Sequence, residues 1–159
     1  MQKSASVAFD ISKAHADEPV FSRAVFETTD PVELSKDHFI VKNGTKCAGA
    51  HLIVDMYDAR HLDDLPRMEQ AFLDAVNAAG ATLLHIHMHH FSPNGGISGV
   101  AVLAESHISV HTWPERNYAA FDVFMCGVAR PELAVDVLRR AFAPERIEVK
   151  EYLRGAVTE

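Results

Sequence analysis

This sequence has few cysteines, no excess of positive charge and no long apolar run. Its only cysteines, Cys47 and Cys126, are too few for a disulfide framework and fit a reducing cytoplasm. The formal net charge of -7 argues against a nucleic-acid-binding surface, because contacts to phosphates need clustered lysine and arginine. No apolar run approaches the roughly twenty residues of a membrane-spanning helix, and residues 1–6 precede no apolar core typical of a signal peptide. We therefore expect a cytoplasmic protein with no nucleic-acid or membrane partner.

The chain does have the length and the apolar content for one domain. Hydrophobic residues make up 48% of its 159 residues, which argues against wholesale disorder and allows a single compact core. Residues 1–45 alternate short apolar and polar pieces punctuated by prolines, so we expect a partly ordered N-terminal extension there. We expect the domain itself to span residues 46–159.

Two stretches show the periodicity of amphipathic helices. Apolar residues recur every three or four positions from Leu65 to Ala79, with Asp64 before this stretch and Gly80 after it. A second helix is predicted to open at Pro131 and to end before Pro144. Its predicted apolar face consists of Leu133, Val137, Leu138, Ala141 and Phe142.

Short apolar runs around these helices predict strands, two of which form a hairpin around Asn94-Gly95-Gly96. The order of elements is a strand, a helix, a hairpin, two strands, a helix and a strand. This order predicts an α+β fold, a two-layer sandwich of an antiparallel sheet with helices on one face. The predicted strands are residues 52–57, 81–91, 97–103, 108–112, 121–125 and 147–150.

The densest polar chemistry lies between two of these strands, in residues 104–115. Hydroxyl, imidazole, indole and carboxylate side chains crowd together there, which is costly in a plain core and indicates a site. In an extended segment, Ser109, His111 and Trp113 share one face, and Ser106 lies on the other unless a turn intervenes. No Gly-x-Ser-x-Gly elbow surrounds Ser106, so serine next to histidine is weak support for a hydrolase. The candidate nucleophiles are Ser106, Ser109 and Cys126, and the candidate bases are His107 and His111.

Histidines also line up on the predicted strand 81–91. His85, His87 and His89 share a face at a period of two, and imidazoles in such an array can hold a metal ion. No acidic residue lies close to them in the sequence, and we expect no metal site.

A longer pattern, from Ser98-Gly99 to Cys126-Gly127, is more specific than any of these. Its core reads Glu105-Ser106-His107 and then His111-Thr112-Trp113-Pro114-Glu115. This pattern resembles the self-cleaving bacterial and archaeal S-adenosylmethionine decarboxylases, and the likeness extends from about residue 51 to residue 155. The resemblance implies a proenzyme that cuts itself between Glu105 and Ser106 and turns Ser106 into a pyruvoyl group, a cofactor made from the chain itself.

The resemblance also implies roles for particular side chains. The pyruvoyl group would form a Schiff base with the amine of the substrate, and Cys126 would donate the proton that completes the decarboxylation. His111 would be the proton acceptor in processing, assisted by Ser98. The implied substrate-binding residues are Phe91, Trp113 and Glu115.

The reaction that the resemblance implies is the decarboxylation of S-adenosylmethionine to the aminopropyl donor for spermidine biosynthesis. It would be carried out by a homodimer whose active sites lie near the subunit interface. The loop Ser92–Ile97 is one residue longer than in the family form, and a shifted loop beside Phe91 would alter the adenine pocket and so the substrate preference. A pyruvoyl-dependent ornithine or arginine decarboxylase on the same fold therefore stays open, and an uncleaved, non-catalytic ligand-binding homologue is a remote alternative.

Overall fold

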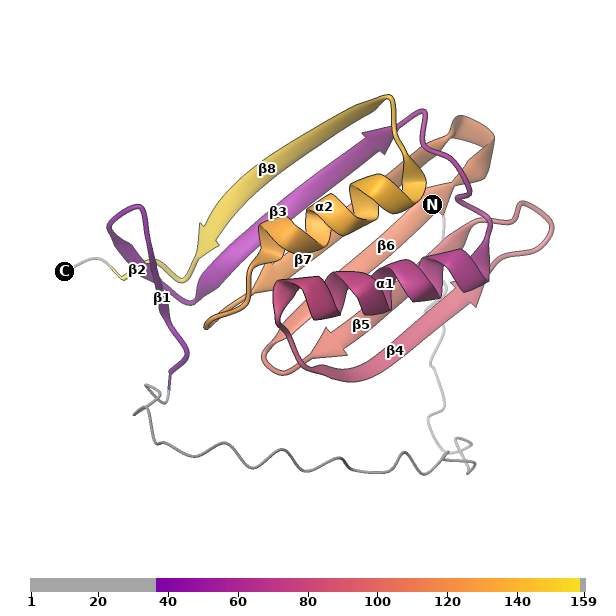
Figure 1. Cartoon of the computed structure of the whole chain (residues 1–159). Coiled ribbons are helices and arrows are strands. Elements are labelled where there is room, and N and C mark those ends of the chain that lie inside the picture. Colours follow the sequence, from indigo (N-terminus) through magenta and orange to yellow (C-terminus); the bar gives the residue numbers. More distant parts are fainter. Residues whose placement is uncertain (1–36, 158–159) are drawn as a thin grey trace, which may run out of the picture. The chain divides into compact units, whose positions relative to one another are not determined.

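The computed structural model describes residues 37–157, which form an antiparallel sheet covered on one face by two helices (Figure 1). The main sheet has six strands in the order β4-β5-β6-β7-β3-β8, and β1 pairs with β2 in a separate two-stranded sheet. The α+β sandwich expected from the sequence is confirmed. The elements are β1 (Ile40–Lys42), β2 (Thr45–Cys47), β3 (Gly49–Tyr57), α1 (Leu65–Ala79), β4 (Leu83–His90), β5 (Ile97–Leu103), β6 (Ser106–Trp113), the 3-10 turn η1 (Pro114–Arg116), β7 (Tyr118–Met125), α2 (Pro131–Phe142) and β8 (Arg146–Arg154).

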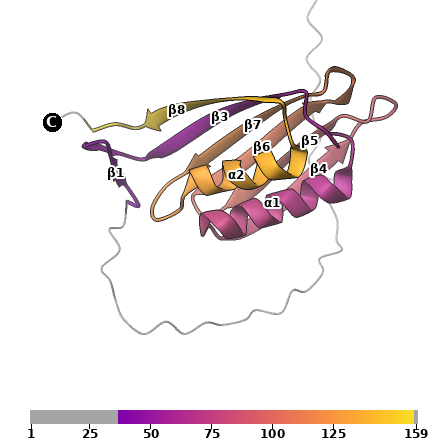
Figure 2. The same ribbon diagram turned by 45° about the horizontal axis from the view of Figure 1, so that its top comes forward.

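The core lies between the main sheet and the helices, which Figure 2 shows as one layer on the same side of the strands. Burial alternates along the central strands, so that Leu52, Val54 and Met56 of β3 all face the helices. On β7, Phe121 is 1% exposed, and its ring centroid lies 6.4 Å from that of Phe72 on α1. Burying each such side chain stabilises the fold by about 1.5–3 kcal/mol relative to leaving it exposed.

Helix α1 follows the sequence prediction at both ends. The Asp64 side chain caps its start by accepting a hydrogen bond of 3.0 Å from the backbone N–H of Arg67. Gly80 ends the helix with φ at 70°, a left-handed conformation that glycine adopts without the cost that a Cβ brings. The buried face, which includes Met68 and Phe72, is the one that the periodicity predicted.

Helix α2 begins at Pro131, as predicted, but its buried face is rotated from the predicted one. Leu133 was assigned to that face and is only half-buried, whereas Ala134 and Val135 take the core positions. The reason is that α2 packs against both the sheet and α1, so its apolar residues are divided between two neighbours.

The edge strand β8 is longer than the sequence indicated. It pairs with β3 along its full length, from Arg146 opposite Tyr57 to Arg154 opposite Gly49. The predicted strand stopped at Lys150, because the remaining residues are mostly polar and exposed, as is common on a sheet edge.

The hairpin of β1 and β2 turns at Asn43-Gly44. It straddles the predicted boundary between residues 45 and 46, and it is tied to β8 by an ion pair from Lys42 to Glu151. The boundary stays a prediction. The part of the predicted extension that spans residues 1–36 lies outside the described residues.

The second face of the main sheet is covered by no element of residues 37–157. On β6 this face carries His107, Ser109, His111 and Trp113, which alternate with the buried side chains of the same strand. The predicted alternation is therefore confirmed, with Ser106 on the helix side. We call this second surface the open face. Within the described part of the chain, no helix is long and apolar enough to cross a membrane.

Candidate active site

The turn between β5 and β6 has a strained backbone. Leu103 pairs with Ser106 across the two strands, which leaves Ala104 and Glu105 as the turn residues. Glu105 has a φ of 60°, and a non-glycine residue in this left-handed region costs about 1 kcal/mol or more. The chain therefore bends tightly immediately before Ser106.

Cys126 contacts this turn through both its backbone and its thiol. Its backbone N–H donates a hydrogen bond of 3.3 Å to Ser106 Oγ, and its thiol Sγ lies 3.7 Å from the same oxygen. The thiol also donates to the carbonyl oxygen of Glu105 at 3.3 Å. The register of β6 against β7 creates this arrangement, because it places the end of β7 beside the start of β6. A hydroxyl and a thiol thus converge on one peptide bond, between Glu105 and Ser106.

Two cavities border this peptide bond. One, of about 480 Å³, opens on the side of His51 and His107, and another, of about 190 Å³, lies toward Thr82 and Cys126. Glu105 and Ser106 line both cavities. Ser106 is 8% exposed, so its hydroxyl is largely screened from bulk water while it stays next to space that a ligand can fill.

A second cluster lies at the other end of β5 and β6. Ser98 Oγ and His111 Nδ1 are 2.8 Å apart, within hydrogen-bonding distance. A cavity of about 240 Å³ is lined by these two residues together with Phe91, Trp113 and Glu115. The hairpin of β4 and β5, whose turn the sequence predicted around Asn94-Gly95-Gly96, brings Phe91 and Ser98 to its tip.

The predicted site residues therefore form two groups instead of one. Ser106 and His111 are five residues apart on β6, which at about 3.3 Å per residue separates their Cα atoms by about 17 Å. They also point to opposite faces of the sheet. One group comprises Glu105, Ser106 and Cys126, and the other comprises Phe91, Ser98, His111, Trp113 and Glu115.

A row of interacting polar side chains on the open face was not predicted. Asp122 Oδ1 lies 3.1 Å from His51 Nε2, and Arg154 Nη1 lies 3.2 Å from His51 Nδ1. Burial, and next the neighbouring His51, lower the pKa of His107, which favours a neutral imidazole there. Sequence reasoning considered His107 only as a candidate base and missed His51 and Arg154, because only the pairing of β3 with β7 and β8 brings them to this place.

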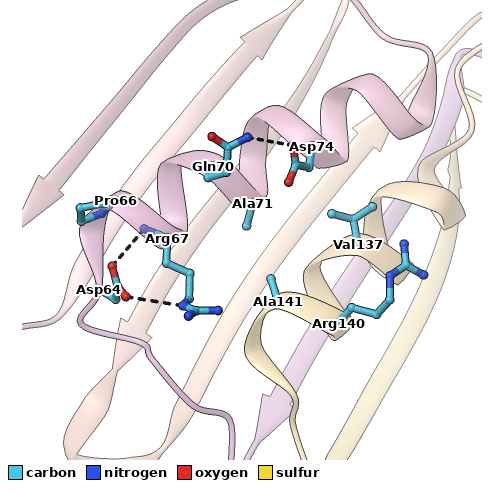
Figure 3. Close-up of a pocket in the computed structure, with 9 residues that line it drawn as sticks. All are labelled: Asp64, Pro66, Arg67, Gln70, Ala71, Asp74, Val137, Arg140 and Ala141. Atoms are coloured by element: carbon cyan, nitrogen blue, oxygen red, sulfur yellow. Dashed lines mark hydrogen bonds and ion pairs between the residues drawn. The ribbon is translucent and has the colours of Figure 1, made fainter.

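Other candidate surfaces have weaker chemistry. No three or more His, Cys, Asp or Glu side chains among residues 37–157 are grouped so that they could hold a metal ion. A groove of about 720 Å³ lies between α1 and α2 (Figure 3), where Arg67 pairs with Asp64 and Gln70 bonds to Asp74. It shares no residue with either group and contains none of the candidate nucleophiles.

Comparison with known proteins gives one consistent result. A family model described as S-adenosylmethionine decarboxylase matches residues 50–155. A protein of Thermomicrobium roseum named S-adenosylmethionine decarboxylase proenzyme is 45% identical over 115 residues, which cover 72% of this chain and 99% of the relative. A protein of Methanococcus vannielii with the same name is 47% identical over 115 residues, covering 70% of this chain and 93% of the relative. The crystal structure of the adenosylmethionine decarboxylase from Aquifex aeolicus superposes with a TM-score of 0.61 at 34% identity, over 70% of this chain and 93% of that one. This chain belongs to the S-adenosylmethionine decarboxylase family.

Proposed function

We propose that this protein cleaves itself between Glu105 and Ser106 and then decarboxylates S-adenosylmethionine, which yields the aminopropyl donor for spermidine biosynthesis. The observation that carries the proposal is the convergence of the Ser106 hydroxyl and the Cys126 thiol on the Glu105–Ser106 peptide. The names of the relatives support it, since they are called proenzymes of this decarboxylase.

The cleavage uses the hydroxyl of Ser106 and the thiol of Cys126, which lie side by side at the turn. Ser106 Oγ attacks the carbonyl carbon of Glu105, the C–N bond breaks, and the nitrogen of Ser106 takes up the proton, which leaves an ester. Removal of the Ser106 α-proton then expels the ester oxygen, so that Glu105 departs with a carboxylate. Water replaces the nitrogen, which is lost as ammonia, and a pyruvoyl group remains. The Cys126 thiol stabilises the oxygen of Glu105 while negative charge develops on it.

The surroundings of Ser106 fit such a group. A pyruvoyl ketone supplies an electrophile for the amine of the substrate and a sink for the electrons released with carbon dioxide. Cys126 lies close enough to Ser106 to return a proton to the reacting carbon, and the cavity of about 480 Å³, which Glu105 and Ser106 line, gives room for a substrate. Both cysteines in the described region are free, as this role and a reducing cytoplasm require.

The second group of residues completes the proposed site from another copy of the chain. Ser98 and His111 assist processing, and Phe91, Trp113 and Glu115 bind the nucleoside part of the substrate. Because His111 is about 17 Å from Ser106 along β6, we infer that two copies pack through their open faces with their β6 strands antiparallel. A two-fold interface of this kind sets the His111 end of one copy against the cavity that its partner's Ser106 lines, which opens on the side of His51 and His107. Trp113 and Tyr152, which are 42% and 51% exposed, provide apolar surface for such a contact.

The mass of the purified protein under denaturing conditions tests the first step. Two fragments are expected, residues 1–105 and a second fragment that begins with a pyruvoyl group in place of Ser106. A single chain that stays intact on long incubation would contradict the proposal and favour a binding protein. Release of carbon dioxide from carboxyl-labelled S-adenosylmethionine, compared with labelled ornithine and arginine, then identifies the substrate.

A further inference from the structure

A histidine that precedes the β1–β2 hairpin contacts the side chain of Glu105, the residue before the peptide bond that we propose is cleaved. The backbone carbonyl of His38 accepts a hydrogen bond of 3.0 Å from the N–H of Gly127, the residue that follows Cys126. The imidazole Nε2 of His38 lies 3.5 Å from Glu105 Oε1. His38 thus contacts both sides of the site, the β5–β6 turn and the end of β7. It also lines the cavity of about 190 Å³ beside Ser106 and precedes the residues 50–155 that the family model matches.

Several contacts hold His38 in this place. The preceding residue, Asp37, accepts a hydrogen bond from the backbone N–H of Phe39 and lies 3.5 Å from Lys46 Nζ. The ammonium of Lys46 also lies over the ring of Phe39, 5.6 Å from its centroid. The segment is therefore fixed to the β1–β2 hairpin. The side chains of His38 and Glu105 are 40% and 54% exposed, and an ion pair so exposed adds little to the stability of a fold.

The position of the Glu105 carboxylate affects the peptide bond. Its second oxygen, Oε2, lies 3.9 Å from Cys126 Sγ, whereas the carbonyl oxygen of Glu105 lies 3.3 Å from that sulfur. A thiol has one proton to donate, so the carboxylate and the carbonyl compete for it. The His38 imidazole holds the other carboxylate oxygen and so keeps the carboxylate from drawing the thiol away from the carbonyl.

We propose that His38 is a positioning residue for self-cleavage. It holds the Glu105 side chain, and through it the left-handed backbone at Glu105, so that the carbonyl stays beside both the Ser106 hydroxyl and the Cys126 thiol. In this role His38 neither donates a proton to the reacting groups nor accepts one from them. The inference rests on the proposed function, because it concerns the same cleavage.

The experiment follows the cleavage of the full chain made by cell-free synthesis, sampled over time on denaturing gels. H38A should cleave about ten- to hundredfold more slowly than the unchanged chain, the cost of a reacting group misplaced by about an ångström. H38Q, whose side-chain amide can still donate to Glu105, should stay within about threefold of the unchanged chain. H61A is the matched control, because His61 is also exposed and has a positive φ of 60°, against 48° for His38, but lies away from the turn. It should cleave at the unchanged rate.

A double-mutant cycle separates this role from a general loss of structure. E105Q replaces the carboxylate, which competes for the thiol unless His38 holds it, with a weaker neutral acceptor, so adding H38A to E105Q should cost nothing more. The inference is overturned if H38A cleaves as fast as the unchanged chain, if H61A is slowed as much as H38A, or if H38A slows the E105Q chain equally. If the unchanged chain never cleaves, the proposed function itself fails, which is a distinct result.

Discussion

The two ends of β6 differ in how much of their chemistry one chain provides. At the start of the strand, Ser106 is buried and Cys126 contacts it through both its backbone and its thiol. At the other end, His111 is bonded to Ser98, and Trp113 is 42% exposed on the open face. The groups around the peptide bond are thus assembled within one chain, whereas the groups at the other end face outward, toward a surface that a partner can cover.

The largest effect should come from removing the hydroxyl at the buried end. S106A should remain one intact chain with no decarboxylase activity, because the chain then has no oxygen to attack Glu105. The mass under denaturing conditions and carbon dioxide release measure both effects. S109A is the matched control, since Ser109 lies on the same strand but on the open face, and it should still cleave. A cleaved S106A chain would contradict the mechanism.

Removing the Cys126 thiol should separate self-cleavage from decarboxylation, the two reactions proposed at the buried end of β6. C126A should still produce two fragments, at a reduced rate, but its decarboxylation should be about a hundred- to ten-thousandfold slower, the usual value of a positioned acid. Mass spectrometry measures the first effect, and single-turnover assays of fully cleaved protein measure the second. Normal turnover by C126A would remove this residue from the role of proton donor.

A mixture of two inactive chains tests whether the two ends of β6 meet across a dimer. S106A lacks the hydroxyl at the buried end of β6, and H111A lacks the imidazole at the exposed end. We expect each variant to be inactive or very slow alone. In a mixed dimer, one site combines the intact Ser106 of one copy with the intact His111 of the other. Co-expression should therefore restore about a quarter of the unchanged activity, if the copies pair at random. No restoration would mean that both ends act within one chain.

Phe91 tests whether the exposed end of β6 contributes to substrate binding. Its ring is 48% exposed, and its centroid lies 4.4 Å from that of His89. F91A should raise KM for S-adenosylmethionine by about tenfold, since stacking of an aromatic side chain on a base is worth about 1–3 kcal/mol, and it should leave cleavage unchanged. A steady-state assay on cleaved protein gives both constants. An effect on kcat alone would place Phe91 in the chemistry instead.

The smallest effect concerns pH. The pKa of His107 in the folded chain lies below its ordinary value of 6.5, mainly because of burial. The unfolded chain therefore takes up more protons as the pH falls through about 6.5, and the free energy of unfolding decreases. H107N should flatten this dependence between about pH 7 and pH 5 in urea titrations. H85N, which changes an exposed histidine on β4, should keep the original slope, and an equal slope in H107N would contradict the assignment.

The sequence predicted features that depend on local pattern and missed those that depend on register. Helix α1 was predicted to the residue, because its period and the caps Asp64 and Gly80 are local signals. The resemblance pointed to Ser106 and His111 as parts of one site, although the local alternation of an extended strand already placed them on opposite faces. His51 and Arg154 meet only through the pairing of β3 with β8, which spacing along the chain does not reveal. His38 was passed over because it lies in a segment interpreted as an appendage.

The strand order has a consequence for the protein after cleavage. Fragment 1–105 would contain β3, β4 and β5, and the second fragment β6, β7 and β8, yet β3 lies between β7 and β8 in the sheet. The fragments are interleaved, so neither can leave without breaking ladders on both sides of β3. Folding before the cut is a reaction of one molecule, but refolding after it requires two fragments to find each other. The cut would therefore make refolding dependent on protein concentration. The processed enzyme would keep its fold because the chain folded before it was cleaved.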